Sequence, residues 1–270
     1  MAKTLCVSNR KGGVGKTTST AALAGEFASR GMRTLCIDMD PQGSLSLIAG
    51  FKLAELDPAE STMALVLPDL WDPEIDPSEL PVAAPWGGDV IPTNNILKKA
   101  KPELESRQGS IKRLDRSLRR LHDRYDVILI DTRPSDDVLV QNALMASDGV
   151  LIPVEVEYQA VSGLAEILNE LDEFREYDKP ELEVIGVFGT VFEPTLHCRD
   201  IAGLLQGDLL PDGLVMRTLI PKRTGLRDAH GNHMGLREYD PSGDATVAYA
   251  ALADEILDRL PDLAAVPVSA

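Results

Sequence analysis

Short apolar runs alternate along this chain with longer stretches in which apolar residues recur at helical spacing. The short runs predict strands at residues 4–8, 33–38, 89–92, 125–131, 149–153, 183–188 and 214–220. The longer stretches predict helices at residues 18–30, 110–124, 137–146, 160–176, 197–206 and 244–260. Strands that alternate with helices indicate a parallel sheet with right-handed crossovers. The pattern therefore predicts an α/β domain whose mostly parallel, twisted sheet of about seven strands carries helices on both faces.

No stretch with the composition of a domain linker interrupts this alternation, so we expect a single domain over residues 1–260. Residues 51–88 are rich in Pro and Asp and only weakly periodic, and we interpret them as a variable insertion with some helix. Residues 261–270 are expected to form a flexible C-terminal tail. With 270 residues, 44% of them hydrophobic, the chain is long enough to bury a substantial core.

The stretch from Lys11 to Thr18, KGGVGKTT, lies between the first predicted strand and the first predicted helix. This layout is typical of a phosphate-binding loop, or P-loop, because glycines let backbone N–H groups surround an anion at a helix N-terminus. Lys16 is expected to contact the β- and γ-phosphates of a nucleotide, and Thr17 to coordinate Mg²⁺. The predicted nucleotide contacts are Lys11, Gly12, Gly13, Val14, Gly15, Lys16, Thr17 and Thr18. The alternative is a glycine-rich turn that binds nothing.

The loop departs from the common P-loop pattern at Arg10, which stands in place of a glycine and is followed by a second lysine, Lys11. This variant, the deviant Walker A box, resembles the ParA/MinD family of P-loop ATPases, and ParA/Soj-type partitioning ATPases in particular. The resemblance covers nearly all of the chain except residues 51–88 and 189–213. It implies a P-loop NTPase fold, ATP and Mg²⁺ as cofactors, and a homodimer in the ATP-bound state. It also implies that Lys11 crosses the dimer interface to the nucleotide of the other subunit, so that Lys11 and Lys16 both have catalytic roles.

Three acidic residues follow two of the predicted strands. Asp131 ends the most apolar strand, and we expect it to hold Mg²⁺ through water, because ligands of open α/β sheets bind beyond the carboxyl ends of the strands. Asp38 and Asp40 end a neighbouring strand and are expected to point toward the same crevice. The similarity to the family motif Asp-x-Asp-Pro-Gln-Gly gives Asp40 the catalytic role of orienting or activating water, and leaves Asp38 as a supporting metal ligand. Alternatively, either residue only caps the end of its strand.

Two further expectations depend on the resemblance. After the Mg²⁺-binding acid the family usually reads Asp-x-Pro-Pro-Ser, whereas residues 131–135 of this chain read DTRPS. Arg133 therefore replaces a proline in the switch loop beside the γ-phosphate. It either adds a hydrogen-bond donor that alters the hydrolysis rate or is a solvated surface arginine. Pro221 lies where the family places the adenine ring, and is the remaining predicted cofactor contact.

The net charge of −16 argues against casual binding of nucleic acid, but the charge is unevenly distributed. Residues 51–89 hold nine acids and one lysine, and residues 155–183 hold ten acids and two bases. Residues 98–124 instead carry ten Lys and Arg against four acids. Cys6, Cys36 and Cys198 show no paired spacing, and we interpret them as small core residues in a reducing cytosol. Because no apolar run has the length of a membrane span and no signal-peptide pattern precedes the first strand, we expect a cytoplasmic protein without a membrane partner.

The resemblance further implies non-specific DNA binding, a ParB-like partner that stimulates hydrolysis, and a role in plasmid or chromosome segregation in the nucleoid-associated cytoplasm. Two basic surfaces are candidates for the DNA contact: Arg113, Arg116, Arg119, Arg120 and Arg124 on the predicted helix, or Lys222, Arg223 and Arg227. The second lies where the family has its DNA-binding arginines, although Gly225 stands at the usual arginine position. The arginines of the first equally fit a solvated face paired with the acidic segments.

Two other functions remain open at this point. A MinD-like or orphan ATPase would position a membrane or a protein cargo, but it requires a basic amphipathic C-terminal helix. Residues 254–270 contain Arg259 as their single arginine. A metabolic P-loop kinase or synthetase is the other alternative, although nothing in the sequence indicates a second substrate pocket.

Overall fold

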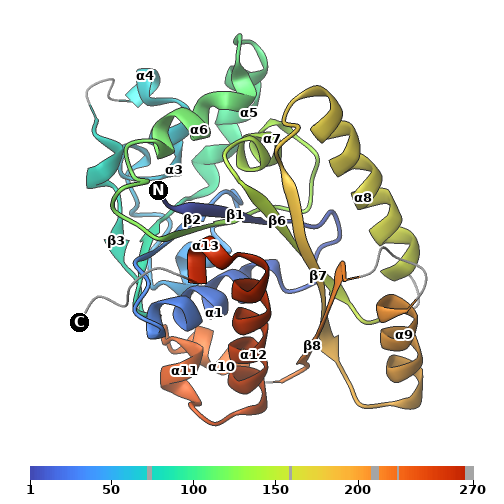
Figure 1. The fold of residues 1–270 in the computed structure, drawn as a ribbon. Helices are drawn as coiled ribbons and strands as arrows, with labels where there is room; N and C mark the ends of the chain where they lie inside the picture. The colour runs from blue at the N-terminus through green and yellow to red at the C-terminus, as the bar shows by residue number, and fades with distance from the viewer. Residues whose placement is uncertain (72–74, 158–159, 208–212, 224, 265–270) are drawn as a thin grey trace.

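The computed structural model describes residues 1–71, 75–157, 160–207, 213–223 and 225–264. Within them, eight strands form one sheet in the order β3–β4–β2–β5–β1–β6–β7–β8 (Figure 1). Their bounds are β1 (Lys3–Val7), β2 (Thr34–Asp38), β3 (Val82–Ala83), β4 (Asp89–Ile91), β5 (Val127–Asp131), β6 (Gly149–Glu155), β7 (Glu183–Phe192) and β8 (Val215–Pro221). Neighbouring strands are parallel, except that β3 runs antiparallel to β4. The predicted α/β class is confirmed, and all seven predicted strands form.

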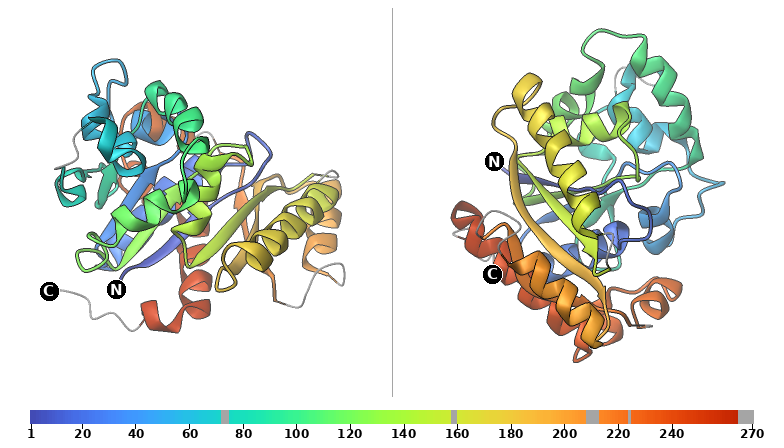
Figure 2. Two further views of the ribbon diagram at one scale, coloured as in Figure 1. Left: turned by 90° about the horizontal axis from the view of Figure 1, so that it is seen from above. Right: turned by 90° about the vertical axis from the view of Figure 1, so that its right-hand side faces the viewer.

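Helices cover both faces of the sheet, as the alternating pattern predicts (Figures 1 and 2). One core contains side chains of α3 (Thr62–Val66), α5 (Ala100–Glu105), α6 (Arg113–Leu118), α7 (Val138–Met145), α8 (Ala160–Tyr177) and α9 (Leu196–Gln206). The other contains side chains of α1 (Lys16–Ser29), α2 (Ser44–Ile48), α10 (Gly225–Gly231), α11 (Leu236–Tyr239), α12 (Asp244–Arg259) and α13 (Pro261–Ala264). Strand residues alternate between the two: Ile128 and Ile130 enter the first core, and Val127 and Leu129 the second.

Residues 51–88 contribute more to the fold than the sequence predicts. The eighth strand, β3, lies in this insertion and adds an antiparallel edge to the sheet. All five residues of α3 are buried, and the short helix α4 (Pro68–Trp71) follows it. The Ser61 hydroxyl caps α3 by accepting a hydrogen bond from the Met63 N–H (3.2 Å), and the Thr62 hydroxyl donates to the carbonyl oxygen of Asp38 (2.9 Å). The insertion therefore supports the carboxyl end of β2.

Two predicted segments differ from the structure. The basic helix predicted over 110–124 is an α-helix only at α6, after a 3₁₀ turn at Ser110–Lys112, and turns follow from residue 119. Within the segment expected to be a flexible tail, Pro261–Ala264 form α13, and Leu263 is buried to 4% exposure. Leu263 packs in the same apolar core as Leu260, and burial of its side chain anchors this turn. Residues 265–270 lie outside the described part of the chain.

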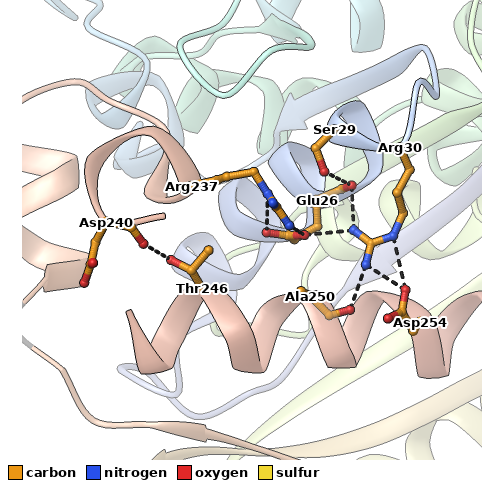
Figure 3. Close-up of polar contacts among 8 residues, drawn as sticks. All are labelled: Glu26, Ser29, Arg30, Arg237, Asp240, Thr246, Ala250 and Asp254. Carbon is orange, nitrogen blue, oxygen red and sulfur yellow. Dashed lines mark hydrogen bonds and ion pairs between the residues drawn. The ribbon is translucent and has the colours of Figure 1, made fainter. Parts of the chain in front are cut away.

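A buried carboxylate joins α1 to the C-terminal helices (Figure 3). The Glu26 side chain, 3% exposed, accepts hydrogen bonds from Arg30 (2.8 Å) and from Arg237 of α11 (2.7 Å). Arg30 also donates to the carbonyl oxygen of Ala250 (2.9 Å) and to Asp254 (2.7 Å), both on α12. Because a buried charge is tolerated only when it is paired in this way, the network fixes α1, and with it the start of the P-loop helix, against α11 and α12.

Candidate nucleotide-binding site

The P-loop between β1 and α1 has backbone conformations that favour glycine. Gly13 and Gly15 have φ angles of 82° and 83°, in the left-handed region where a side chain is strained. A Cβ atom placed on Gly13 would meet no atom within 4 Å, so the loop faces open space. No side chain caps the N-terminus of α1, so the N–H groups of its first turn have no side-chain acceptor there. These features are those of a phosphate cradle and argue against a simple turn.

Three polar side chains that the sequence analysis missed hold the loop in place. The Asn9 amide donates to the carbonyl oxygen of Pro153 (2.8 Å) and its oxygen accepts the Lys11 N–H (2.8 Å). The Thr190 hydroxyl, near the end of β7, donates to the carbonyl oxygen of Val14 (2.9 Å). The Thr132 hydroxyl, after β5, donates to the carbonyl oxygen of Val7 at the end of β1 (2.9 Å). All three lie at the carboxyl ends of strands, a position that the sequence pattern does reveal.

Lys16 is the most buried cation of the loop, with 6% of its surface exposed. Its ammonium group donates to the carbonyl oxygen of Lys11 (2.9 Å), so it lies folded back along the loop. Burial lowers the pKa of Lys16, while the charges of Asp131 and Asp40 act to raise it. The side chain thus lies beside both predicted acids and within a phosphate cradle, which is where a cation for the β- and γ-phosphates is needed.

Asp38 and Asp131 face each other across neighbouring strands at the same level. The register pairs Asp38 of β2 with Asp131 of β5, and Asp131 with Val7 of β1, immediately before the P-loop. Both carboxylates are 0% exposed. Burial, followed by the charge of Asp38, raises the pKa of Asp131, and the Thr17 hydroxyl opposes this rise by hydrogen bonding. The three predicted metal-binding residues, Thr17, Asp38 and Asp131, are therefore brought together.

The electrostatics of this group fit Mg²⁺. The Oδ2 atom of Asp131 is buried and has no hydrogen-bond partner, and an unpaired buried carboxylate oxygen is costly. In the described part of the chain, no three His, Cys, Asp or Glu side chains form a metal cage. Mg²⁺ commonly keeps its waters and binds through one or two carboxylates and the phosphates of a nucleotide. Asp131 and Thr17 are the residues that would hold it, and the ion would neutralise charge on the phosphates.

Asp38 and Asp40 differ in their surroundings. Both oxygens of Asp38 accept hydrogen bonds: Oδ2 from the hydroxyl and N–H of Ser46 (2.7 and 2.9 Å), and Oδ1 from the N–H of Asp40 (3.1 Å). Burial raises the pKa of Asp38 to about 7, and these hydrogen bonds act against that rise. Asp40 is partly exposed and accepts only the Gln42 N–H through its side chain (2.9 Å). Asp38 thus supports the loop that leads to α2, whereas Asp40 is the acid with access to water.

Lys11, the second lysine of the loop, is held by two carboxylates of its own chain. Its ammonium group pairs with Glu155 at the end of β6 (2.8 Å) and with Glu157 two residues later. Burial acts to lower the pKa of Lys11, but the hydrogen bonds that its ammonium group donates to these two acids outweigh it and raise the pKa. Lys11 lies at the mouth of the loop, 45% exposed, and must leave these acids in order to contact another subunit.

The switch loop after β5 covers one side of the P-loop. A Cβ atom on Gly12 would lie 3.9 Å from the Cγ atom of Pro134. Arg133 pairs with Asp137 (3.0 Å), which also caps α7 by accepting the Leu139 N–H (3.2 Å). Arg133 is therefore held by the residue that caps the next helix, and its effect on the hydrolysis rate stays a prediction.

Pro221 ends β8 at the carboxyl edge of the sheet and pairs with Phe192 of β7. Since β7 is also the strand whose Thr190 holds the P-loop, Pro221 lies one strand beyond that contact. The adenine contact stays a prediction.

The first candidate surface for DNA is occupied by ion pairs with the acidic insertion. Arg113 pairs with Asp69 (3.4 Å), Arg120 with Asp76 (3.9 Å), and the Arg124 guanidinium donates to the carbonyl oxygen of Ser78. Arg119 pairs with Asp115 of its own helix. These contacts favour the interpretation in which the basic segment serves the fold.

The second candidate surface also has acidic partners. Lys222 pairs with Glu193 (2.7 Å) and Arg223 pairs with Asp244. These acids are exposed, so the pairs are of the kind that contributes little to stability and opens readily. The side chain of Arg227 lies outside what the structure describes.

The sequence and the fold are similar to those of known proteins. A family model described as an AAA domain matches residues 2–184, which places the chain among the P-loop ATPases. The chromosome partitioning protein ParA of Myxococcus xanthus is 32% identical over 257 residues, covering 94% of this chain and 88% of that protein. The sporulation initiation inhibitor protein Soj of Bacillus subtilis is 32% identical over 256 residues, covering 95% and 98%. The chain belongs to the ParA/Soj family of ATPases, as its P-loop predicts.

Solved structures give the same fold. The cobyrinic acid a,c-diamide synthase of Mycobacterium smegmatis, with bound ADP and magnesium, superposes with a TM-score of 0.81 at 29% identity. The match covers 97% of this chain and 96% of that one. Among the described residues, every helix is too short or too polar to cross a lipid bilayer.

Replacing Asp131 with Asn should stabilise the protein when metal and nucleotide are absent. A carboxyl group whose pKa is raised by folding holds its proton more tightly in the folded state, so its contribution to stability falls as pH rises from its unfolded pKa through its folded pKa. The melting temperature of Asp131→Asn in EDTA should therefore exceed that of the wild type, and by more at pH 8 than at pH 6. Each kcal/mol corresponds to about 2–4 °C.

The same variant should lose the rise in melting temperature that ATP with Mg²⁺ gives the wild type, because the metal-binding carboxylate is missing. Asp172→Asn removes an exposed carboxylate and serves as the control, with no change in either measurement. A variant that is no more stable than the wild type at pH 8 would show that burial and the charge of Asp38 do not destabilise the ionised Asp131 carboxylate.

Proposed function

We propose that this chain is a partitioning ATPase that switches between two states through ATP. Binding of ATP and Mg²⁺ brings two copies together as a homodimer that holds DNA without sequence preference. A ParB-like partner stimulates hydrolysis and releases the dimer, so that a plasmid or chromosome is segregated in the nucleoid-associated cytoplasm. The observation that carries the proposal is the P-loop with its additional Lys11, which follows β1 where Val7 pairs in register with Asp131, in a member of the ParA/Soj family.

Each site residue has a role in this proposal. Lys16 contacts the β- and γ-phosphates, and Thr17 and Asp131 hold the metal ion, with Asp38 supporting the loop beside them. Asp40, the partly exposed acid, positions the attacking water. The bound ADP and magnesium of the Mycobacterium smegmatis protein support ATP and Mg²⁺ as the cofactors here.

The name of that protein also supports a second candidate, an ATP-dependent synthase that amidates a small molecule. The two functions differ in what ATP does. A synthase consumes ATP only with its substrate and an amide donor present, and it does not require DNA or a change in its mass. A partitioning ATPase forms a dimer with ATP alone. Light scattering with and without a slowly hydrolysed ATP analogue therefore separates the two functions.

Lys11→Ala should leave ATP binding to the monomer intact but prevent the ATP-dependent dimer. The P-loop keeps Lys16 and its backbone, whereas the contact across the interface is lost. The measurement is the mass in solution with the slowly hydrolysed analogue, and Lys16→Ala is the control that should abolish nucleotide binding itself. If the Lys11→Ala dimer forms with unchanged affinity, the role of Lys11 across the interface is excluded.

The Asp40→Ala variant should bind ATP and Mg²⁺ but should not hydrolyse the ATP. Because hydrolysis separates the subunits, the dimer should accumulate with ordinary ATP, which is measured by phosphate release and by mass. A residue that positions or activates water commonly contributes a factor of 10²–10⁴, so a loss of less than about tenfold would assign the role to another residue.

DNA binding should depend on Lys222, Arg223 and Arg227. A dimer with a charge near −32 (twice −16) is repelled by DNA at long range, so it needs a local basic surface. We favour these residues because they lie where the family has its DNA-binding arginines, whereas three arginines of the first surface contact the insertion. Changing all three to Ala should weaken ATP-dependent DNA binding and reduce the salt slope, which is about −0.9 for each phosphate neutralised.

The matched variant changes Arg116, Arg119 and Arg120 to Ala, with melting temperatures measured for both triple variants. Loss of DNA binding in the matched variant alone would move the contact to the first surface. If the wild type with ATP never binds DNA at low salt, the proposed mechanism fails for this chain.

A further inference from the structure

The backbone on both sides of Arg133 is fixed against the P-loop. Before it, the Thr132 hydroxyl donates to the carbonyl oxygen of Val7, the last residue of β1 (2.9 Å). After it, the Cγ atom of Pro134 lies 3.9 Å from the position that a Cβ atom on Gly12 would take. Because the backbone is fixed there, the rotamer of Arg133 decides whether its guanidinium faces the phosphate cradle or turns away from it.

In this structure the guanidinium is turned to Asp137. Its Nη1 atom donates to Oδ2 of Asp137 (3.0 Å), while Oδ1 of the same carboxylate accepts the N–H of Leu139 and so caps α7 (3.2 Å). The side chain of Asp137 is 5% exposed, and that of Arg133 is 32% exposed. Asp137 thus uses separate oxygen atoms for the arginine and for the helix.

The ion pair between Arg133 and Asp137 can open without leaving Asp137 uncompensated. Asp137 is the N-cap residue of α7, where a carboxylate gains from the capping hydrogen bond and from the helix dipole. Among the described residues, one carboxylate holds Arg133, whereas two acids hold each of Arg10 and Lys11. Of these three basic residues beside the loop, Arg133 is therefore the one that is released most easily.

We propose that Arg133 is a catalytic residue for ATP hydrolysis, and that Asp137 holds it out of the site until a γ-phosphate is bound. The guanidinium then turns from Asp137 to the γ-phosphate oxygens, while Asp137 stays in place as the cap of α7. That the reaction is hydrolysis of ATP is the part that rests on the proposed function.

A cation at the γ-phosphate accelerates this reaction. Water forms a bond to the γ-phosphorus while the bond from that phosphorus to the β,γ-bridging oxygen breaks, and the products are ADP, inorganic phosphate and a proton. Negative charge develops on the leaving oxygen and is spread over the γ-oxygens. Lys16 is the buried cation of the P-loop side. Arg133, on the switch loop, would add a planar fork of N–H donors, which suits phosphate oxygens better than a single ammonium group.

The first test replaces Arg133 with Gln, which removes the charge and keeps a long polar side chain. Arg133→Gln should lower kcat at least about tenfold and leave the Kd for ATP within about threefold of the wild type, because the contact forms with the phosphate in transfer. Arg133→Lys keeps the charge without the fork and should lose less. Arg175→Gln, which removes an exposed arginine of α8, is the control and should leave kcat unchanged.

A second measurement does not depend on turnover. Binding of fluorescent mant-ADP with Mg²⁺ is compared with and without aluminium fluoride, which mimics the phosphoryl group in transfer. The wild type should bind mant-ADP more tightly when aluminium fluoride is present. Arg133→Gln should lose at least about tenfold of that gain and bind mant-ADP alone as the wild type does.

The third test addresses the restraint by Asp137. Because Asn caps a helix as well as Asp does, Asp137→Asn keeps the cap of α7 and removes the ion pair. Its kcat should rise by about two- to fivefold, the range that a partly exposed ion pair contributes. The rise should disappear in the double variant with Arg133→Gln. Asp172→Asn should leave kcat unchanged, and melting temperatures check that every variant is folded.

Each measurement has a result that overturns part of the proposal. Equal kcat and equal binding of mant-ADP with aluminium fluoride in the wild type and Arg133→Gln would exclude Arg133 from the site. A fall in kcat with equally weakened binding of ATP and ADP would make it a structural residue. An unchanged or lower kcat in Asp137→Asn would exclude the restraint. If the wild type releases no phosphate from ATP, the proposed function fails, while the aluminium fluoride measurement still decides the role of Arg133.

Discussion

The position of β5 between β1 and β2 is the constraint on which the site depends. It places the end of β1, Asp131 and Asp38 on one level, with the P-loop starting from the same edge. The result is two fully buried carboxylates in register. Burial raises the pKa of both, the charge of Asp38 adds to the rise for Asp131, and the charge of Asp40 adds to the rise for Asp38. Two buried carboxylates destabilise the folded chain unless a cation lies beside them. Lys16 supplies part of the compensating positive charge, and the Oδ2 atom of Asp131, which has no hydrogen-bond partner, is still available to a metal ion.

The P-loop depends on this register in a second way, because its hydrogen bonds come from the neighbouring strands. Thr132 after β5, Asn9 with the carbonyl of Pro153 in β6, and Thr190 of β7 each fix one point of the loop or of the strand before it. The loop is thus positioned by hydrogen bonds that are long-range in sequence. Because its backbone N–H donors are held in place, the loop can bind an anion without first changing its conformation. The Glu26 network fixes α1 against α11 and α12, which pack on the same face of the sheet as α1.

The sequence predicted the seven parallel strands and the main helices because apolar runs and glycine signals decide those elements locally. It also identified Lys16, Asp131 and Asp38 as neighbours, since the carboxyl ends of parallel strands meet at one edge. It did not predict the buried helix α3, the anchoring of α13, or the shortness of α6. Each of these depends on tertiary contacts: Thr62 with Asp38, Leu263 with the second core, and Arg120 and Arg124 with the insertion. The partners of Arg10 and Lys11 are more than 120 residues away, beyond any local pattern.

The ion pairs of Arg10 and Lys11 can be broken with little free energy. Both Arg10 and Lys11 are partly exposed and paired with acids of the same chain. Pairs of this kind contribute about 0–1 kcal/mol each, so breaking one requires little free energy. In the proposed ATP-bound dimer, the triphosphate at the subunit interface would replace the acids that hold Lys11 with a more buried and stronger partner. The acids on β6, α8 and the switch loop therefore keep both residues in place in the single chain and release them when a stronger partner arrives.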